Sequence, residues 1–307
     1  MTRITSRFGE QSTAAEVAAG HDLTGKRAIV TGASAGIGVE TARVLAVRDP
    51  DAVATLIEEI AAAGGKARVS ALDLADLRSI EDFAVRERGQ PLHLLIANAG
   101  IMACPLGRTA QGFETQLGVN HLGHFLLTRL LLPALMEAGG ARVVVVSSTG
   151  HHWGAFDFVD PNFERKPYDP LLAYGASKSA NALFALELDR RYRDKGIRAF
   201  SLMPGAIHTS LARYMTDEAF AQIGAKMEGM TNPEWKTVEQ GAATSIWAAL
   251  APELEGQGGL YLEDCNEALP AVSGLNRGVQ PWAIDPDAAK RLWDWSEAAV
   301  AGARAAA

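Results

Sequence analysis

The chain has 307 residues, of which 48% are hydrophobic and 21% are charged, so it is long enough to bury a large core. Its 29 basic and 36 acidic residues give a formal net charge of -7, and the basic residues form no run that could follow a phosphate backbone. This composition argues against nucleic acid as a partner.

Cysteine usage and hydropathy narrow the class of protein further. The two cysteines, Cys104 and Cys265, favour reduced thiols over a disulfide framework or a metal site, so we expect a cytoplasmic protein without a metal. Residues 1–11 are polar, unlike a signal peptide. The most apolar segment, residues 125–135, contains Arg129 and Pro133, so no membrane span is expected.

Short apolar runs alternate with longer helical patterns along the chain. Residues 1–24 are Ala-rich and polar and predict an arm that leads into the first strand. The runs that predict strands are brief, rich in branched aliphatic residues and bounded by Gly, Asn, Asp or Pro. They cover residues 28–31, 67–72, 92–97, 143–147, 197–203 and 260–262. Helical patterns cover residues 37–47, 53–63, 77–88, 115–137, 174–194 and 239–250.

This alternation predicts an α/β fold. Strands that are apolar on both faces and alternate with amphipathic helices indicate a parallel sheet covered on both sides, which is a doubly wound, Rossmann-type three-layer sandwich. We expect an N-terminal arm over residues 1–24 and a single domain over residues 25–297, with a substrate lid near residues 206–235. A flexible Ala-rich tail is expected over residues 298–307.

A glycine-rich turn directly follows the first predicted strand. The sequence from Thr31 to Gly38 reads TGASAGIG and leads into a helical pattern. Glycines permit a tight turn and a close approach of the backbone to a pyrophosphate, while the helix N-terminus supplies free N–H groups. A glycine-rich loop without a ligand is the competing interpretation, but the position between a strand and a helix favours nucleotide binding.

Tyr174 and Lys178 form an i,i+4 pair at the start of a long helical pattern. Such a pair lies on one helical face, where the ammonium would stabilise the phenolate and lower the pKa of Tyr174 toward neutrality. Tyr174 could then give a proton to a carbonyl oxygen or remove one from an alcohol. A surface tyrosine beside a solvated lysine is the alternative, and the glycine-rich turn upstream argues against it.

Polar side chains also follow other predicted strands. Ser148 lies where a strand meets its C-terminal loop, the edge at which ligands bind in open α/β sheets, and it could donate a hydrogen bond to a substrate oxygen. Asn98, Ala99 and Gly100 close another strand, and Asn120 lies within the sequence NHLGHF. The structural alternatives are a capping serine at Ser148 and a buried asparagine that only bonds the backbone at Asn120.

Together these motifs resemble the short-chain dehydrogenase/reductase family, and within it the branch of retinol dehydrogenases and WW-domain oxidoreductases. The resemblance covers residues 23–297, where the motifs TGASAGIG, Asp73-Leu74, Asn-Ala-Gly, NHLGHF, Ser-Ser-Thr, YGASK and PGAIHT occur in family order. It implies an NAD(P)(H)-dependent enzyme that moves a hydride between a nicotinamide and a carbonyl or alcohol group.

The resemblance also implies a role for each motif. Tyr174 would be the acid/base, Ser148 would polarise the carbonyl, Lys178 would hold the nicotinamide ribose, and Asn120 would support a water relay. Cofactor binding would involve Gly32, Ser34, Gly36, Ile37 and Gly38 at the pyrophosphate, Asp73 and Leu74 at the adenine, Asn98, Ala99 and Gly100 along the cofactor, and Pro204, Gly205 and Thr209 at the carboxamide.

Residues 39–66 depart from the family pattern, because they are about ten residues too short for a full helix, a second strand and another helix. Either the second strand is missing, or residues 43–47 form it and the first helix is cut to about one turn. Arg48 matches the position where relatives carry an arginine facing the 2′-phosphate of NADP, which favours NADP(H) over NAD(H). A simple turn between helices at residues 48–51 explains Arg48 equally well.

The segment that follows PGAIHT is suited to covering a hydrophobic ketone, aldehyde or alcohol, or equally to a core or dimer contact. Its apolar side chains are Leu211, Tyr214, Met215, Phe220, Met227 and Met230. The resemblance leaves a homodimer or homotetramer open, with residues 115–137 and 174–194 as contact helices. Two other functions compete: a non-catalytic nucleotide-sensing or scaffold protein, and an epimerase or dehydratase, which the glycine spacing disfavours.

Overall fold

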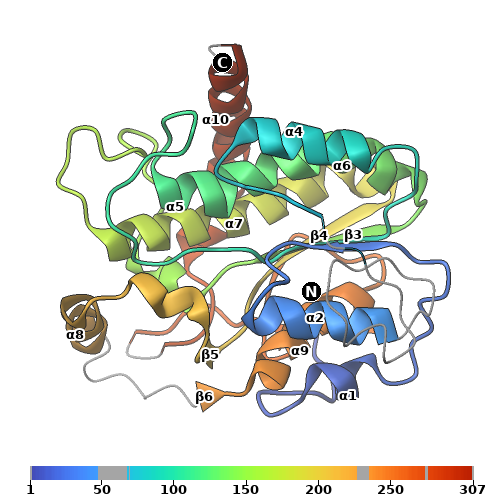
Figure 1. The fold of residues 1–307 in the computed structure, drawn as a ribbon. Helices are drawn as coiled ribbons and strands as arrows, with labels where there is room; N and C mark the ends of the chain where they lie inside the picture. Colours follow the sequence, from blue (N-terminus) through green and yellow to red (C-terminus); the bar gives the residue numbers. More distant parts are fainter. Residues whose placement is uncertain (1, 48–67, 69, 227–234, 274–275, 306–307) are drawn as a thin grey trace.

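The computed structural model describes residues 2–47, 68, 70–226, 235–273 and 276–305. These residues form a six-stranded sheet that lies between two layers of helices, as Figure 1 shows. Its strand order is β1 (Ala28–Val30), β2 (Leu94–Ala97), β3 (Ala141–Val146), β4 (Ile197–Met203), β7 (Leu260–Glu263) and β8 (Asn266–Glu267). The first five strands are parallel and β8 is antiparallel to β7, so the expected α/β fold is confirmed.

Side chains alternate between the two faces of the sheet, so a separate core forms on each face. In β3, Val143 and Val145 pack into one core, whereas Val144 and Val146 pack into the other. Successive strand residues point to opposite faces, so a strand covered on both sides has to be apolar at every position. The continuous apolar run over residues 143–146 meets this requirement.

Helices cover both faces of the sheet. One layer consists of α1 (Ala14–Ala18), α2 (Gly36–Val47) and α9 (Val238–Leu250). The other consists of α4 (Leu77–Arg86), α6 (Gly123–Glu137), α7 (Pro170–Tyr192) and α10 (Pro286–Ala305). Asp169 caps α7 by accepting hydrogen bonds from Leu171 and Leu172, and Pro170 takes the first helical position that proline favours. The helix therefore begins before Tyr174, which lies in its second turn.

Shorter elements connect the sheet and its helices. α5 (Thr115–Leu117) runs into a π-helical turn, η1 (Gly118–Leu122), which continues as α6. The 3-10 helices are η2 (Thr149–Trp153), η3 (Arg193–Lys195), η4 (Ser210–Tyr214), η5 (Pro252–Leu254) and η6 (Pro281–Ala283). The region expected to form the lid contains β5 (Ala206–Ile207) and α8 (Asp217–Lys226), and β5 pairs with β6 (Trp235–Lys236).

The strand expected over residues 67–72 is not found, since residues 68 and 70–72 belong to no strand and residues 67 and 69 lie outside the described part of the chain. A segment becomes a strand only when its backbone pairs with a neighbouring strand. Within the described residues, β1 has such a neighbour on one edge, where it pairs with β2.

The first helix is not cut short. Residues 43–47 continue α2 as far as Val47, so the alternative in which they form the second strand is wrong. Ala42, Val44 and Leu45 are buried in the core beneath α2, which favours the helix over an isolated strand. Arg48 and the helix expected over residues 53–63 lie outside the described residues.

The Ala-rich stretch expected to be a flexible tail, residues 298–307, is helical through Ala305. Alanine has the highest helix propensity, and tertiary contacts hold the last turns of α10 in place. Val300 is buried, and Arg304 forms an ion pair with Glu81 of α4. The N-terminal arm is also fixed, because the backbone N–H of Ile4 donates to the Glu267 carboxylate at 2.9 Å.

Candidate functional site

Glycines shape the turn between β1 and α2. Gly32 has a φ of 68°, and a Cβ atom there would lie 2.7 Å from the Cα of Ala99. A Cβ on Gly38 would collide with the Gly32 carbonyl oxygen and the Asn98 amide. These positions leave no room for a side chain, so glycine allows the turn to pack against Asn98 and Ala99. The N-terminus of α2 then faces the adjoining cavity.

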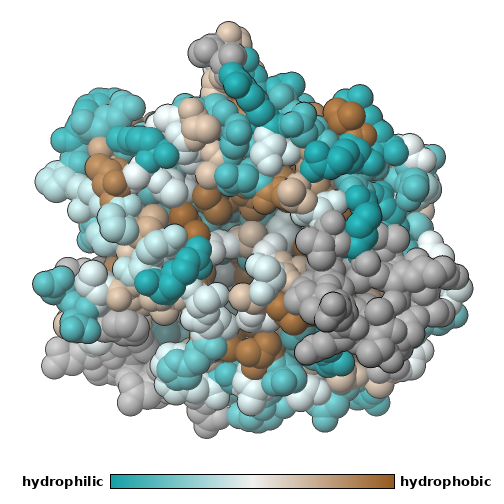
Figure 2. Space-filling model, in the orientation of Figure 1, coloured by the Kyte–Doolittle hydropathy of each residue, from teal (hydrophilic) through white to brown (hydrophobic). Residues whose placement is uncertain are grey.

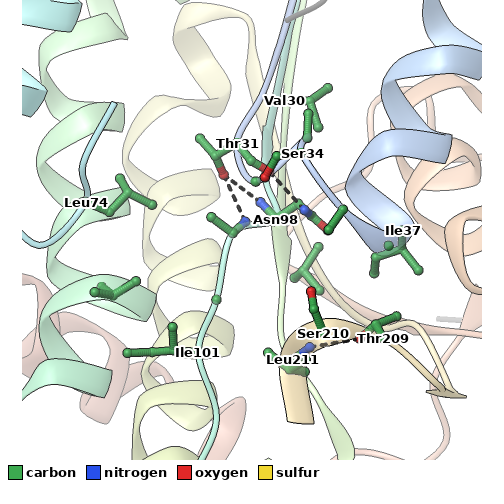
Figure 3. A pocket seen from close by; sticks show the side chains of 18 of the residues that line it. Val30, Thr31, Ser34, Ile37, Leu74, Asn98, Ile101, Thr209, Ser210 and Leu211 are labelled. Atoms are coloured by element: carbon green, nitrogen blue, oxygen red, sulfur yellow. Dashed lines mark hydrogen bonds between the residues drawn. The ribbon is translucent and has the colours of Figure 1, made fainter. Parts of the chain in front are cut away.

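Thr31 joins this turn to the turn that follows β2 (Figure 3). The backbone N–H groups of Asn98 and Ala99 each donate to Thr31 Oγ1 at 3.0 Å, and Asn98 Nδ2 donates to the Thr31 carbonyl at 2.9 Å. Two motifs that are far apart in the sequence therefore form one unit at the edge of the sheet.

A cavity of about 590 Å³ opens at the carboxyl ends of β1 to β4. In Figure 2, hydrophobic side chains gather in and around a hollow near the centre of this face. None of the described residues that line the cavity is acidic, whereas Lys178 and Arg213 add positive charge, which suits an anionic ligand. The lining includes these residues expected from the sequence: Gly32, Ser34, Gly36, Ile37, Leu74, Asn98, Ala99, Gly100, Ser148, Tyr174, Lys178, Pro204, Gly205 and Thr209.

Three of the expected site residues lie away from the cavity wall: Gly38, Asp73 and Asn120. Gly38 packs behind the turn against Gly32. The Asp73 carboxylate accepts a hydrogen bond from the backbone N–H of Ala75 at 2.8 Å and so closes its own turn.

Tyr174 is only 1% exposed, and burial raises the pKa of its phenol to about 12, although a hydrogen bond with Ser148 opposes the rise. The i,i+4 pair with Lys178 predicted that the pKa of Tyr174 is lowered toward neutrality, and this prediction is wrong for this structure. Lys178 Nζ lies 5.8 Å from the centre of the Tyr174 ring. The cost of burying a phenolate outweighs the stabilisation that an ammonium at this distance provides.

Lys178 is held at the end of β3. Its Nζ donates to the Val146 carbonyl at 2.8 Å, and its own carbonyl accepts a hydrogen bond from the Ser147 hydroxyl at 2.8 Å. Burial lowers the pKa of Lys178 to about 7, because the interior disfavours the charged form. The ammonium therefore titrates near neutral pH.

Ser148 both caps η2 and faces the cavity. The backbone N–H of Gly150 donates to Ser148 Oγ at 3.0 Å, so the capping alternative from the sequence is confirmed as a contact. This cap does not use the Ser148 hydroxyl hydrogen, which can be donated to Tyr174 or to a substrate oxygen. A Cβ on Gly150 would lie 2.5 Å from the Tyr174 ring, so the glycine allows the serine loop to approach the tyrosine.

The Asn120 side chain is buried and hydrogen-bonded within the protein. Its Oδ1 accepts from the backbone N–H of Ile101 at 2.9 Å, and its Nδ2 donates to the Ile101 carbonyl at 3.0 Å and to Ser177 Oγ at 2.9 Å. The backbone-bonding alternative therefore describes only part of its contacts, because Nδ2 also bonds the Ser177 hydroxyl. Asn120 still lies directly behind the cavity, because a Cβ on Gly100 would be 3.4 Å from Asn120 Oδ1.

Sequence reasoning missed other residues of the cavity wall, which include Val30, Leu72, Phe83, Ile101, Val119, Ser210 and Arg213. The sequence could have indicated two of them by their position next to a recognised motif, because Ile101 follows Gly100 and Val119 precedes Asn120. Among the residues expected in the lid, Leu211 lines the cavity and Tyr214 is 43% exposed. Met227 and Met230 lie outside the described residues.

The residues present fit a dinucleotide. The turn from β1 to α2 offers backbone N–H groups and tolerates no Cβ at Gly32 or Gly38, as a close approach to a pyrophosphate requires. Lys178 has hydrogens beyond the one given to Val146, which can reach hydroxyl groups of a ribose.

Among the described helices, none is both long and apolar enough to cross a membrane.

Comparison with known proteins agrees with this geometry. The family model for short chain dehydrogenases matches residues 26–219. The chain belongs to this family. As a short-chain dehydrogenase it is an oxidoreductase that acts on CH–OH and carbonyl groups and binds NAD(P).

Relatives cover almost the whole of this short-chain dehydrogenase. It is 47% identical to a probable oxidoreductase of Streptomyces lividans, over 89% of this chain and 97% of that protein. It is 42% identical to retinol dehydrogenase 11 of Mus musculus, over 89% of this chain and 86% of that protein, which confirms the expected branch. The solved structure of a dehydrogenase/reductase from Sinorhizobium meliloti is 26% identical, with a TM-score of 0.60 over 79% of this chain and 94% of that one.

Proposed function

We propose that this enzyme transfers a hydride between the nicotinamide of NADP(H) and a hydrophobic ketone or aldehyde, or the matching alcohol, with Tyr174 as the acid/base. The observation that carries the proposal is the convergence of Ser148, Tyr174 and Lys178 on the cavity that the glycine-rich turn also lines. A single cavity thus combines groups suited to anion binding with groups suited to proton transfer.

In carbonyl reduction, the Tyr174 hydroxyl gives its proton to the substrate oxygen. Its pKa of about 12 keeps the phenol protonated at neutral pH, so it is ready to act as an acid. Ser148 Oγ accepts from Gly150 and donates its own hydrogen to the same substrate oxygen as negative charge develops there. In alcohol oxidation the proton moves in the opposite direction, and the neighbouring Lys178 ammonium favours the phenolate.

Lys178 and Asn120 support this centre. One N–H of Lys178 is taken by Val146, and we assign the others to the nicotinamide ribose. Asn120 would support a water relay from its place behind Gly100. NAD(P)H supplies the hydride when it is bound, and the oxidised cofactor accepts it.

The proposed cofactor contacts follow the lining of the cavity. The turn from Gly32 to Gly38 would hold the pyrophosphate, and the loop from Pro204 to Thr209 would hold the carboxamide. We assign Asp73 and Leu74 to the adenine, and Asp73 also closes its own turn by accepting from the N–H of Ala75. The preference for NADP(H) rests on Arg48, which lies outside the described residues, and stays a prediction from the sequence.

A hydrophobic substrate suits the remaining wall. Ile101, Val119 and Leu211 line the cavity beside the motif residues, and their aliphatic side chains can cover an apolar group. A cytoplasmic location and a homodimer or homotetramer also stay predictions.

The first test measures cofactor binding. We expect NADPH to raise the apparent melting temperature and to bind more tightly than NADH, because only a ligand of the folded state stabilises it. Arg48→Ala should weaken NADPH binding by roughly tenfold to a hundredfold, as loss of a charge-assisted hydrogen bond does, and leave NADH binding unchanged. Arg88→Ala, at an exposed arginine away from the cavity, is the control.

Titration of nicotinamide fluorescence and thermal unfolding provide the measurements. A folded protein that responds to neither cofactor would overturn the proposal and favour the non-catalytic nucleotide-sensing or scaffold function. Equal affinity for NADPH and NADH would show that Arg48 does not contact the 2′-phosphate of NADP.

The second test removes the proposed acid/base. Tyr174→Phe should lower kcat by roughly a hundredfold to ten-thousandfold, because it deletes the proton donor, while NADPH binding stays largely intact. Tyr192→Phe is a matched control, since that hydroxyl bonds Arg129 on the outer face of α6. Steady-state kinetics with a panel of apolar aldehydes and ketones would measure the change, and an unchanged kcat in Tyr174→Phe would rule out the mechanism.

A further inference from the structure

His124 is a buried histidine that the mechanism above does not use. It lies in α6, one turn after Asn120, and is 1% exposed. Both ring nitrogens have partners: Nδ1 lies 3.0 Å from the Asn120 carbonyl oxygen, and Nε2 lies 2.8 Å from Thr31 Oγ1. The ring therefore bridges the end of β1 and the π-helical turn that carries Asn120.

The partners determine which nitrogen carries the hydrogen. A carbonyl oxygen can only accept, so Nδ1 must donate to Asn120. Burial, with a contribution from the charge of Lys178, lowers the pKa of His124 to about 4, so the ring is neutral at physiological pH and Nε2 is an acceptor. The Thr31 hydroxyl then donates to Nε2, at a shorter distance than the 3.4 Å to its other acceptor, the Ile96 carbonyl.

This direction leaves the Thr31 oxygen free to accept on its other side. It receives the backbone N–H groups of Asn98 and Ala99, each at 3.0 Å, as Figure 3 shows. Every hydrogen-bonding position of the threonine hydroxyl is thus used, and its orientation is fixed by Nε2. Loss of the acceptor at Nε2 would let the hydroxyl rotate and weaken the junction of the two cofactor turns.

The opposite end of the bridge leads to the catalytic helix. Asn120 donates to Ser177 Oγ at 2.9 Å, and the Ser177 hydroxyl donates to the Tyr174 carbonyl at 2.7 Å. Hydrogen bonds therefore link the turns that line the cofactor cavity to the backbone of Tyr174, with Asn120 bonded to His124 through its backbone carbonyl and to Ser177 through its side-chain amide.

We propose that His124 is a positioning residue with two separable tasks: Nε2 orients the cofactor-binding turns through Thr31, and Nδ1 fixes Asn120 relative to Tyr174. The inference rests on the proposed function, because it assigns cofactor binding to the first end and turnover to the second.

Two substitutions separate these tasks. His124→Asn can replace the Nδ1 donor but is too short to reach Thr31, so the dissociation constant for NADPH should rise about threefold to tenfold while kcat changes little. His124→Gln can replace the Nε2 acceptor but not the donor to Asn120, so kcat should fall about threefold to tenfold with NADPH affinity retained.

His121→Gln is the matched control. His121 is equally buried and lies on the same helical stretch, but its Nε2 bonds Ser296 of α10, away from the cavity. This variant should lose stability without a change in kcat or in the NADPH dissociation constant. The proposal would be wrong if both His124 variants showed the same fall in kcat together with the same rise in the NADPH dissociation constant. Such a result would mean that the substitutions act only by lowering stability.

Single variants of Thr31 provide a second test that does not depend on the folding of the His124 variants. Thr31→Val should raise the NADPH dissociation constant about threefold to tenfold, whereas Thr31→Ser, which keeps the hydroxyl, should not. In the Thr31→Val background, His124→Asn should add no further loss, because residues of one network are not additive.

Binding is read by NADPH fluorescence and thermal shift, and kcat by steady-state turnover. Additive effects of the two substitutions, or a normal dissociation constant in Thr31→Val, would overturn the inference. Failure of the proposed function would look different, since the unmodified protein itself would then bind no NADPH.

Discussion

Lys178 shows how burial sets the chemistry of one residue. Its ammonium has a backbone partner at Val146, and no carboxylate among the described residues forms an ion pair with it. Burial therefore lowers its pKa from 10.5 to about 7. The folded protein therefore favours the neutral amine of Lys178, whereas the unfolded chain keeps it protonated up to its ordinary pKa.

This difference predicts how stability depends on pH. Between pH 7 and 10.5 the unfolded chain binds a proton at Lys178 that the folded chain does not, so the free energy of unfolding should rise with pH across this window. Relative to Lys178→Met, the unmodified protein should gain about 2 kcal/mol between pH 7 and pH 9. Urea unfolding of both proteins at the two pH values measures the gain.

The comparison with Lys178→Met removes the contribution of other groups. The buried histidines have lowered pKa values and act below pH 7. The pKa values of Cys265 and Tyr174 are raised to about 12 from 9.0 and 10.0, so these groups act above pH 9, outside the measured interval. Parallel changes in the two proteins would mean that Lys178 stays fully charged in the fold.

At the scale of elements, α10 seals the outer face of the helix layer. Trp293 is 2% exposed and packs edge-on against Phe125 of α6, with ring centres 5.1 Å apart, and stacks on Phe184 of α7 at 5.9 Å. Ion pairs join α10 to both helices, from Glu297 to Arg129 at 2.8 Å and from Asp294 to Arg191 at 3.1 Å. The aromatic contacts, buried from water, dominate over these exposed ion pairs.

Replacing this tryptophan should therefore destabilise the whole domain. Trp293→Ala removes a large buried ring between two helices, and we expect a loss of about 3 to 5 kcal/mol in the free energy of unfolding. Lys290→Ala, at an exposed position of the same helix, should change it by less than about 0.5 kcal/mol. A denaturant titration that found equal stability for the two variants would show that α10 does not contribute to the core.

At the scale of the whole molecule, the cavity lies where the carboxyl ends of four strands meet, between the two cores. The loops after β1, β2, β3 and β4 each contribute part of its wall, although long stretches of sequence separate them. Parallel strands bring their carboxyl ends to one edge, so a rigid sheet can hold groups from distant motifs at fixed positions.

The position of α10 limits which surface a second copy of the chain could contact. The helices that the sequence analysis expected to meet a second copy correspond to α6 and α7, and α10 packs over both, as Trp293 and the ion pairs to Arg129 and Arg191 show. In Figure 1 the C-terminal part of α10 extends beyond these helices. A homodimer or homotetramer would therefore use a surface that includes α10, or another face of the molecule.

Much of the fold and of the site could be predicted from the sequence, because those signals are local. Short apolar runs and helical periodicity place β1 to β4, β7, α2, α4, α6, α7 and α9 within a few residues, whereas α1, α8 and α10 were not predicted. Glycines at fixed spacing specify the turn before α2. The pair Tyr174 and Lys178 needs only helical geometry to share a face. Such features depend on neighbours within one or two turns of the chain.

Other features were decided by contacts between distant segments. The sequence contains the i,i+4 pair Asn120 and His124, but only the fold brings Thr31 to the other side of the imidazole ring. Burial, which depends on the whole tertiary structure, raised the pKa of Tyr174 where a nearby lysine was expected to lower it. The Ala-rich C-terminus became helix because Val300 is buried in the core and Arg304 pairs with Glu81 of α4. Sequence determined which groups are present, and tertiary structure decided their partners and charge, because desolvation and long-range packing have no local signal.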